Sequence, residues 1–372
     1  MITERIIAPA RFSHASAITS FRQGTLFACY TGDAECHRTQ KVCLYYFHDN
    51  GAVSKPATLE DLTGNPVLLT WGGPGLGTIH PDREDNWTRS APQFAKIIYS
   101  KFEKLVPSRV EWWQHCSLWV RDVGLNKEGE IIAGPPQQLM FDGEEDQPED
   151  YLGYLPRCNP ITTYDGYLLP LYRENDPHFH GTILHSEDAV NWTYQGTIGR
   201  GTRCIQPTLW REDGKIHALL RNFFYRWAPN SQRFAYYSCS EDNGKTWSEL
   251  SLSKFPNCNN SILAIDCYNR DTRKKQMLYI WNNDLNGRQH LTLGTEGRRP
   301  LVTLDGYGSY PAACIHDNKL HITYTAKANH YKSPYAKTVI KYKQYCLLQL
   351  LNEGLKYDQA NSPLNSPPST WV

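Results

Sequence analysis

The chain has 372 residues and a formal net charge of +1, from 39 Lys and Arg against 38 Asp and Glu, which argues against bulk attraction to nucleic acid or membrane surfaces. Its aromatic fraction of 12%, with 11 Trp and 23 Tyr but only 3 Met, favours β structure over helices. It holds no apolar run of about 18 residues, so we expect no membrane span.

The N-terminal residues lack a basic region followed by an apolar stretch, which predicts a cytoplasmic protein without a signal peptide. The 11 cysteines are scattered singly and form no Cys-x-x-Cys pair, so we expect free thiols and neither a metal site nor a cofactor. No linker divides the chain. We therefore expect one domain over residues 1–358 and a disordered Pro/Ser-rich tail over 359–372.

Short strands joined by tight turns recur along the chain. Asp-Gly, Asp-Asn or a variant lies between two alternating runs in each case, which indicates a β-hairpin. The hairpins expected in this way cover residues 17–28, 162–169, 209–217 and 313–321. Residues 69–86, rich in Gly and Pro, and the acidic residues 142–150 are expected to form surface loops.

One turn carries a fuller motif. Residues 240–247 read Ser-x-Asp-x-Gly-x-Thr-Trp after an alternating run that predicts a strand over 233–240. Asp can accept backbone N–H groups in such a turn, Gly supplies φ > 0, and Trp packs beneath it. A shortened copy begins at Ser186, and a third hairpin is expected around Gly294, so the three are spaced evenly.

This motif resembles the Asp-box of the sialidase-type β-propellers. The order of motifs from about Tyr154 to Lys343 is also similar to that of BNR-repeat sialidase-like proteins, and it includes the segments 157–160, 205–209, 218–221, 256–261, 281–288, 308–311 and 321–325. The resemblance implies an all-β fold: one six-bladed β-propeller of four-stranded antiparallel blades, with its site at the mouth of a central channel.

The resemblance also implies a site for a terminal acidic sugar. Arg221 and Arg288 match two of the three arginines that bind the substrate carboxylate, and Tyr310 matches the nucleophile. The expected function is sialidase-like hydrolysis of an acidic oligosaccharide or glycoconjugate by a monomer.

The remaining positions depart from that pattern. His14 stands where the first arginine is expected, and Gln206 stands where the carboxylate that activates the tyrosine is expected. Glu174 is a candidate to take over that role, and Asp33 and Glu35 are candidates for the acid that protonates the leaving oxygen. Two alternatives therefore stay open: a uronate-directed rhamnosidase or polysaccharide lyase on the same propeller, and a propeller that only binds glycans.

Overall fold

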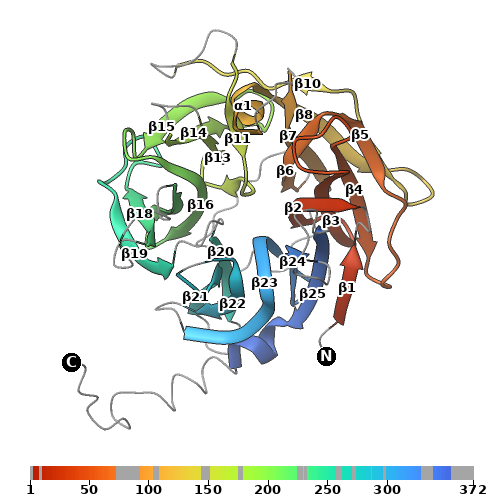
Figure 1. Cartoon of the computed structure of the whole chain (residues 1–372). Helices are drawn as coiled ribbons and strands as arrows, with labels where there is room; N and C mark the ends of the chain where they lie inside the picture. The colour runs from red at the N-terminus through yellow and green to blue at the C-terminus, as the bar shows by residue number, and fades with distance from the viewer. Residues whose placement is uncertain are drawn as a thin grey trace.

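In this computed structural model the described residues are 3–7, 11–72, 93–103, 109–143, 151–174, 179–223, 229, 233–256, 262–269, 274–285, 287–295, 299–327 and 338–352. The fold is all-β, as expected. Its strands gather in groups around a ring in the view of Figure 1. Among the described residues, no helix is long and apolar enough to cross a membrane. The tail 359–372 and most of both expected surface loops lie outside the described residues.

Three sheets hold four or five strands each. The first contains β6 (Thr63–Trp71), β7 (Phe94–Phe102), β8 (Cys116–Leu125), β9 (Ile131–Ala133) and β10 (Gln137–Gln138), with α1 (Arg109–Gln114) between β7 and β8. The second contains β11 (Tyr154–Pro156), β12 (Ile161–Thr162), β13 (Tyr167–Arg173), β14 (Gly181–Ser186) and β15 (Thr193–Ile198). The third contains β16 (Cys204–Glu212), β17 (Lys215–Asn222), β18 (Phe234–Ser240) and β19 (Ser251–Pro256).

The fourth sheet joins three such groups. It starts with β20 (Leu263–Asn269), β21 (Lys274–Asn282) and β22 (Gln289–Thr295). The long strand β23 (Arg299–His316) pairs with β22 along its first part and with β24 (Lys319–Lys327) along its second. Next come β25 (Thr338–Cys346), β2 (Phe12–Ser20), β3 (Gly24–Gly32), β4 (Lys41–His48) and β5 (Ala57–Asp61).

The two ends of the described chain meet in this fourth sheet. Strand β1 (Thr3–Ile7) pairs antiparallel with β25, so that Thr3 stands opposite Gln344 and Ile7 opposite Ile340. The sheets do not close on one another through hydrogen bonds among the described residues, and the number of blades stays a prediction.

All four expected Asp-Gly-type hairpins are present. They are formed by β2 and β3, β12 and β13, β16 and β17, and β23 and β24. These hairpins could be predicted because the residues of each turn determine its conformation. The turn residues Asp213, Asp317 and Asn318 adopt φ of 48°, 47° and 56°, a conformation that Asp and Asn tolerate better than most residues.

The Ser-x-Asp motifs occupy equivalent turns in neighbouring sheets. Ser186 ends β14 and Ser240 ends β18, and in both turns the serine hydroxyl donates to the Asp carboxylate two residues on, at 3.0 and 2.8 Å. Asp242 also accepts from the backbone N–H of Thr246 at 2.8 Å. Ser240 pairs with Ile216, at the opposite end of β17 from Arg221. The two motifs therefore lie at equivalent turns of neighbouring sheets, while the turn after Gly294 lies outside the described residues.

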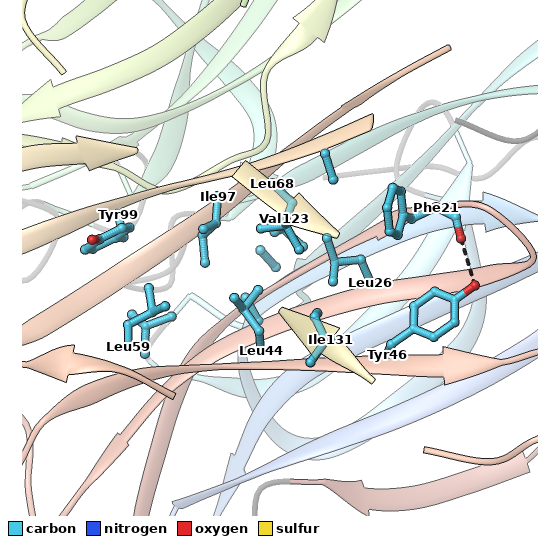
Figure 2. Close-up of a cluster of buried hydrophobic side chains, with 14 of the residues drawn as sticks. Phe21, Leu26, Leu44, Tyr46, Leu59, Leu68, Ile97, Tyr99, Val123 and Ile131 are labelled. Carbon is cyan, nitrogen blue, oxygen red and sulfur yellow. Dashed lines mark hydrogen bonds between the residues drawn. The ribbon is translucent and has the colours of Figure 1, made fainter. Parts of the chain in front are cut away.

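Hydrophobic cores lie between neighbouring strand groups. Figure 2 shows the one between β2–β5 and β6–β9, where Phe21, Leu44 and Leu68 are almost completely buried. Tyr46 closes one end of this core and donates its hydroxyl to the carbonyl of Phe21 at 3.1 Å. Similar cores join β6–β8 to β11–β14 and β13–β15 to β16 and β17, so these strand groups pack against a neighbour on each face.

Candidate active site

Four of the strands that begin a group share one β-bulge. In β2, β6, β16 and β23, two residues stand opposite a single residue of the next strand. The first bulge residue has φ between 43° and 56° in every case, a strained conformation that costs about 1–3 kcal/mol. These residues are Ala15, Asn65, Gln206 and Tyr310. Because a bulge redirects side chains, it explains how Gln206 and Tyr310 come to lie in one site.

Tyr310 is almost completely buried and lies among cations and rings. The Arg288 Nη2 donates to its hydroxyl at 3.2 Å. The guanidinium carbons of Arg288 and Arg157 each lie 4.9 Å from the centre of the Tyr310 ring, within the range of a cation–π contact. The His14 ring meets it edge-on, with 4.6 Å between ring centres.

His14 is a neutral imidazole at pH 7. Burial, and then the positive charges of Arg288 and Arg157, hold the pKa of His14 well below its usual range. Its Nδ1 has no hydrogen-bond partner among the described residues. The ring can therefore accept a proton but cannot serve as a third fixed cation for a carboxylate.

Gln206 links two other residues of the site. Its Oε1 accepts from Arg221 Nη1, and its Nε2 donates to the Tyr172 hydroxyl, both at 3.5 Å. Burial, followed by the charge of Glu174, raises the pKa of Tyr172 well above its usual range. Tyr172 also interacts electrostatically with Tyr310, so this chain of side chains reaches the group around Tyr310.

Glu174 follows strand β13. Burial and, less strongly, the like charge of Glu35 raise its pKa to about 7 against the opposing effect of the Arg221 guanidinium. A carboxyl group in this state is suited to proton transfer near pH 7.

Glu35 lies in the turn after β3 and accepts a hydrogen bond from the Tyr30 hydroxyl at 3.3 Å. The buried side chain of Gln40 fixes this turn by accepting from the Cys36 backbone N–H at 2.8 Å. Asp33 behaves differently. Its carboxylate is exposed and accepts from the Thr39 hydroxyl of the same turn at 3.1 Å.

The structure thus brings together most of the residues expected from the sequence. Tyr30, Arg157 and Tyr172 join them, although sequence reasoning did not assign these three to the site. We define the central cluster as the following ten residues: His14, Tyr30, Glu35, Arg157, Tyr172, Glu174, Gln206, Arg221, Arg288 and Tyr310. Asp33 makes its contacts outside it. A register comparison could have suggested Tyr30, because Tyr30 and Arg221 each pair with the residue just before a bulge.

The cluster can perform three tasks. Its arginines can bind a carboxylate, Glu174 can donate a proton, and the Tyr310 oxygen is held in a fixed position. These groups come from β2, β3, β13, β16, β17, β23 and the segments that follow β3, β11, β13 and β21. Among the described residues, no group of His, Cys, Asp and Glu could hold a metal ion.

Comparison with solved structures places the fold among sialidases. The sialidase of Trypanosoma rangeli in complex with the inhibitor DANA superposes over 98% of this chain and 60% of its own, with a TM-score of 0.66 and 17% identity. A mutant of that enzyme displaying trans-sialidase activity superposes over 96% and 61%, with a TM-score of 0.63 and 15% identity. The chain therefore spans less than two thirds of the length of these proteins.

A more distant likeness is to the endosialidase of phage phi92, which covers 93% of this chain and 69% of its own at 10% identity, with a TM-score of 0.50. No curated protein sequence matches the chain. The family described as the BNR repeat-like domain matches residues 137–322, which include β11 to β23 and five of the residues that the resemblance indicated: Glu174, Gln206, Arg221, Arg288 and Tyr310. By this match, and by the sialidase-like fold that accompanies it, the chain belongs to the BNR repeat-like family.

Proposed function

We propose that this protein is a glycosidase that removes a terminal acidic sugar from a glycan. The observation that carries the proposal is that Arg288 donates to the tyrosine that resembles a sialidase nucleophile, while Arg221, Gln206 and Glu174 gather around Tyr172, which interacts electrostatically with that tyrosine. The sialidase-like fold supports the same class of reaction, although fold alone does not determine chemistry.

Arg221 and Arg288 bind the carboxylate of the sugar in this proposal. A guanidinium stays charged at every relevant pH and presents paired N–H groups to a carboxylate. His14 replaces the third arginine, so the substrate carboxylate receives two cationic contacts and one neutral imidazole.

His14 takes the proton of the Tyr310 hydroxyl while the tyrosine oxygen attacks the anomeric carbon, and the bond from that carbon to the leaving oxygen breaks. Glu174, expected from the sequence to activate the tyrosine, instead gives its proton to the leaving oxygen in this proposal. The resulting carboxylate takes a proton from the water that releases the sugar, and His14 returns its proton to the Tyr310 oxygen. Gln206 cannot exchange a proton here. Its bonds to Arg221 and Tyr172 suit a role in orienting these side chains.

A second candidate follows from the neutral His14 beside Tyr310. In a uronate-directed lyase, an arginine neutralises the uronate carboxylate and a neutral imidazole removes the proton next to it. The edge-on contact of His14 with Tyr310, together with the lowered pKa of His14, favours this alternative over a protein that only binds glycans.

The test is to incubate the protein with sialosides and with uronate-terminated oligosaccharides. Release of a saturated acidic sugar supports the hydrolase, and new ultraviolet absorbance from an unsaturated uronate supports the lyase. Binding without any product would leave the protein as a glycan-binding module. The Arg221→Ala and Arg288→Ala variants should each weaken binding by about 1.5–3 kcal/mol, and Lys at either position should not restore it.

We also propose that the strand groups form a six-bladed propeller and that the protein is a cytoplasmic monomer. Contacts between β23 and β2, β2 and β6, β6 and β11, β13 and β16, β16 and β20, and β20 and β23 support a ring of six groups. Sedimentation analysis checks the monomer, and fractionation of the source cells checks the location.

A further inference from the structure

Arg157 is a buried cation that the proposed chemistry does not use. It lies between β11 and β12 with 3% of its surface exposed. Its Nη1 donates to the carbonyl of Ser16 at 3.2 Å, and its Nη2 donates to the carbonyl of Pro311 at 3.4 Å. Because these donors are directed at the backbone, Arg157 differs from Arg288, which donates to the hydroxyl of Tyr310.

The two carbonyls hold equivalent places in neighbouring strands. Ser16 is the second residue of the β2 bulge, after Ala15, and Pro311 is the second residue of the β23 bulge, after Tyr310. Strands β2 and β23 are in contact. One guanidinium therefore joins the bulge that follows His14 to the bulge that carries Tyr310, while its carbon lies 4.9 Å from the centre of the Tyr310 ring.

Both bulges need such a constraint. Ala15 and Tyr310 have φ of 47° and 51°, which residues with a side chain adopt only when their surroundings impose it. The Arg157 Nε has no hydrogen-bond partner among the described residues, and the two Nη groups donate to the two bulges while the guanidinium lies over the Tyr310 ring. We propose that Arg157 is a positioning residue that fixes the ring of Tyr310 and holds His14 against it. The inference deepens the proposed function and rests on it for its kinetic consequence.

The first experiment needs no turnover. A fluorotyrosine placed at position 310 reports its ring orientation by ¹⁹F NMR. The wild-type background should give resonances of a ring that does not flip on the chemical-shift timescale. In Arg157→Met, which keeps most of the apolar stem, we expect an averaged signal at a changed shift. Arg157→Lys should lie between the two, because one ammonium cannot reproduce the planar fork that reaches both carbonyls.

The matched control is Arg121→Met. Like Arg157, Arg121 donates to a backbone carbonyl, that of Gly134 at 2.9 Å. It is partly buried, donates to the Tyr99 hydroxyl at 3.0 Å and pairs with Glu60. Its loss should destabilise the fold without changing the fluorine signal at position 310. If Arg157→Met does not fold, the comparison of Arg157→Lys with Arg121→Met decides. An unchanged signal in the folded Arg157 variants, or the same change in Arg121→Met, overturns the inference.

The second experiment measures turnover on the substrate found by the product assay. Loss of orientation should lower kcat on the order of 100-fold and change KM little. A raised KM with unchanged kcat would mean that Arg157 binds substrate, and would overturn the positioning role. If the wild type turns over no acidic glycan, the proposed function fails, while the fluorine experiment still decides whether Arg157 fixes the ring.

Discussion

At the scale of single residues, the central cluster holds the Tyr310 oxygen in a fixed position and contains a carboxyl group, that of Glu174, that can exchange a proton. Arg288 and the rings around Tyr310 hold that tyrosine in place, whereas Glu174 sits where burial and Arg221 act on its pKa in opposite directions. A carboxyl group with a pKa of about 7 can both give and regain a proton at neutral pH. The two roles in the proposed reaction are thus separated by environment rather than by residue type.

The first prediction concerns Tyr310. We expect Tyr310→Phe to abolish turnover and to leave the affinity for an acidic sugar near that of the wild type, because only the reacting oxygen is removed. Steady-state kinetics and calorimetric titration measure the two quantities. The control is Tyr194→Phe, which loses a hydroxyl bonded to Thr197 at 2.9 Å and should keep full activity. A Tyr310→Phe variant that retains most of its rate would assign Tyr310 a structural role and favour His14 as the proton-transfer residue.

The second prediction concerns the pH dependence of the rate. If Glu174 is the acid, kcat should fall as the pH rises through about 7, since the carboxyl group loses its proton there. Glu174→Gln should lower kcat at pH 6 by about 10²–10⁴-fold and remove this fall. Glu187→Gln, in the exposed turn after β14, serves as the control. An unchanged profile in the Glu174→Gln variant would exclude Glu174 as the acid.

The third prediction concerns stability. His321 is buried and bonded to the Tyr342 hydroxyl at 2.8 Å; burial, and then the charge of His316, lowers its pKa from 6.5 to about 4. The unfolded chain binds the proton first, so stability is complete above pH 6.5 and is lost as the pH falls toward 4. The free energy of unfolding in urea should fall between pH 7.5 and pH 5 in the wild type, and this fall should be smaller by up to about 2 kcal/mol in His321→Phe. Tyr342→Phe removes the same hydrogen bond and should keep the dependence.

At the scale of elements, hairpins and bulges differ in how far the sequence determines them. In the turn after β18, Asp242, Ser240 and Thr246 bond to one another within a few residues, so the motif alone predicts the structure. Burial raises the pKa of Asp242, but the hydrogen bonds from Thr246 and Ser240 outweigh it and lower the pKa to about 2. The turn therefore remains bonded down to strongly acidic pH.

The fourth prediction belongs to this element. Asp242→Ala removes the acceptor of three hydrogen bonds and should lower the free energy of unfolding by about 1–3 kcal/mol without changing kcat, because the turn lies at the far end of β17 from Arg221. Denaturant titration and kinetics measure the two effects. Asp188→Ala should behave alike, since Asp188 makes the equivalent bonds after β14. A loss of activity in the folded Asp242→Ala variant would contradict this separation of the turn from the site.

The bulges could not be predicted from one strand, because each depends on the register between two. A signal is nevertheless present: Asn65, Gln206 and Tyr310 all precede a proline, and all three adopt positive φ. A residue before proline usually has an extended backbone, so a proline at the next position does not by itself predict a bulge. Arg157 was visible as part of a family motif, but its role depends on carbonyls 141 and 154 residues away in sequence.

At the scale of the whole molecule, the sequence predicted an all-β domain of repeated hairpins. Local turn chemistry recurs along the chain and makes this possible. The sequence predicted neither α1 nor the single sheet in which β23 and β25 join three strand groups. Both features depend on contacts between residues that are far apart in the sequence. Trp112 on α1 is buried against Phe102.

The fifth prediction tests the pairing of β1 with β25. Deleting residues 1–7 removes the ladder to β25 and the ion pairs of Glu4 with Lys341 and Lys343, at 3.3 and 3.1 Å. The edge of β25 is then unpaired, so we expect a lower Tm and concentration-dependent association. Calorimetry and light scattering measure both. A control that replaces Glu4 by Gln should lose little stability and stay monodisperse, because these ion pairs are partly exposed. An unchanged Tm after deletion would show that the β1 ladder contributes nothing.

The same pairing has a consequence for how the protein is made. The partners of β1 lie more than 330 residues further along the chain, from Ile340 to Gln344. At about 5–20 residues per second, a ribosome needs tens of seconds to deliver them. During that time the sheets in the middle of the chain can already form from neighbouring hairpins, while the backbone groups of β1 still lack their hydrogen-bond partners on β25. The growing chain is therefore most exposed to misassociation just before its last strands emerge, and a chaperone that shelters β1 over this interval would raise the yield of native protein.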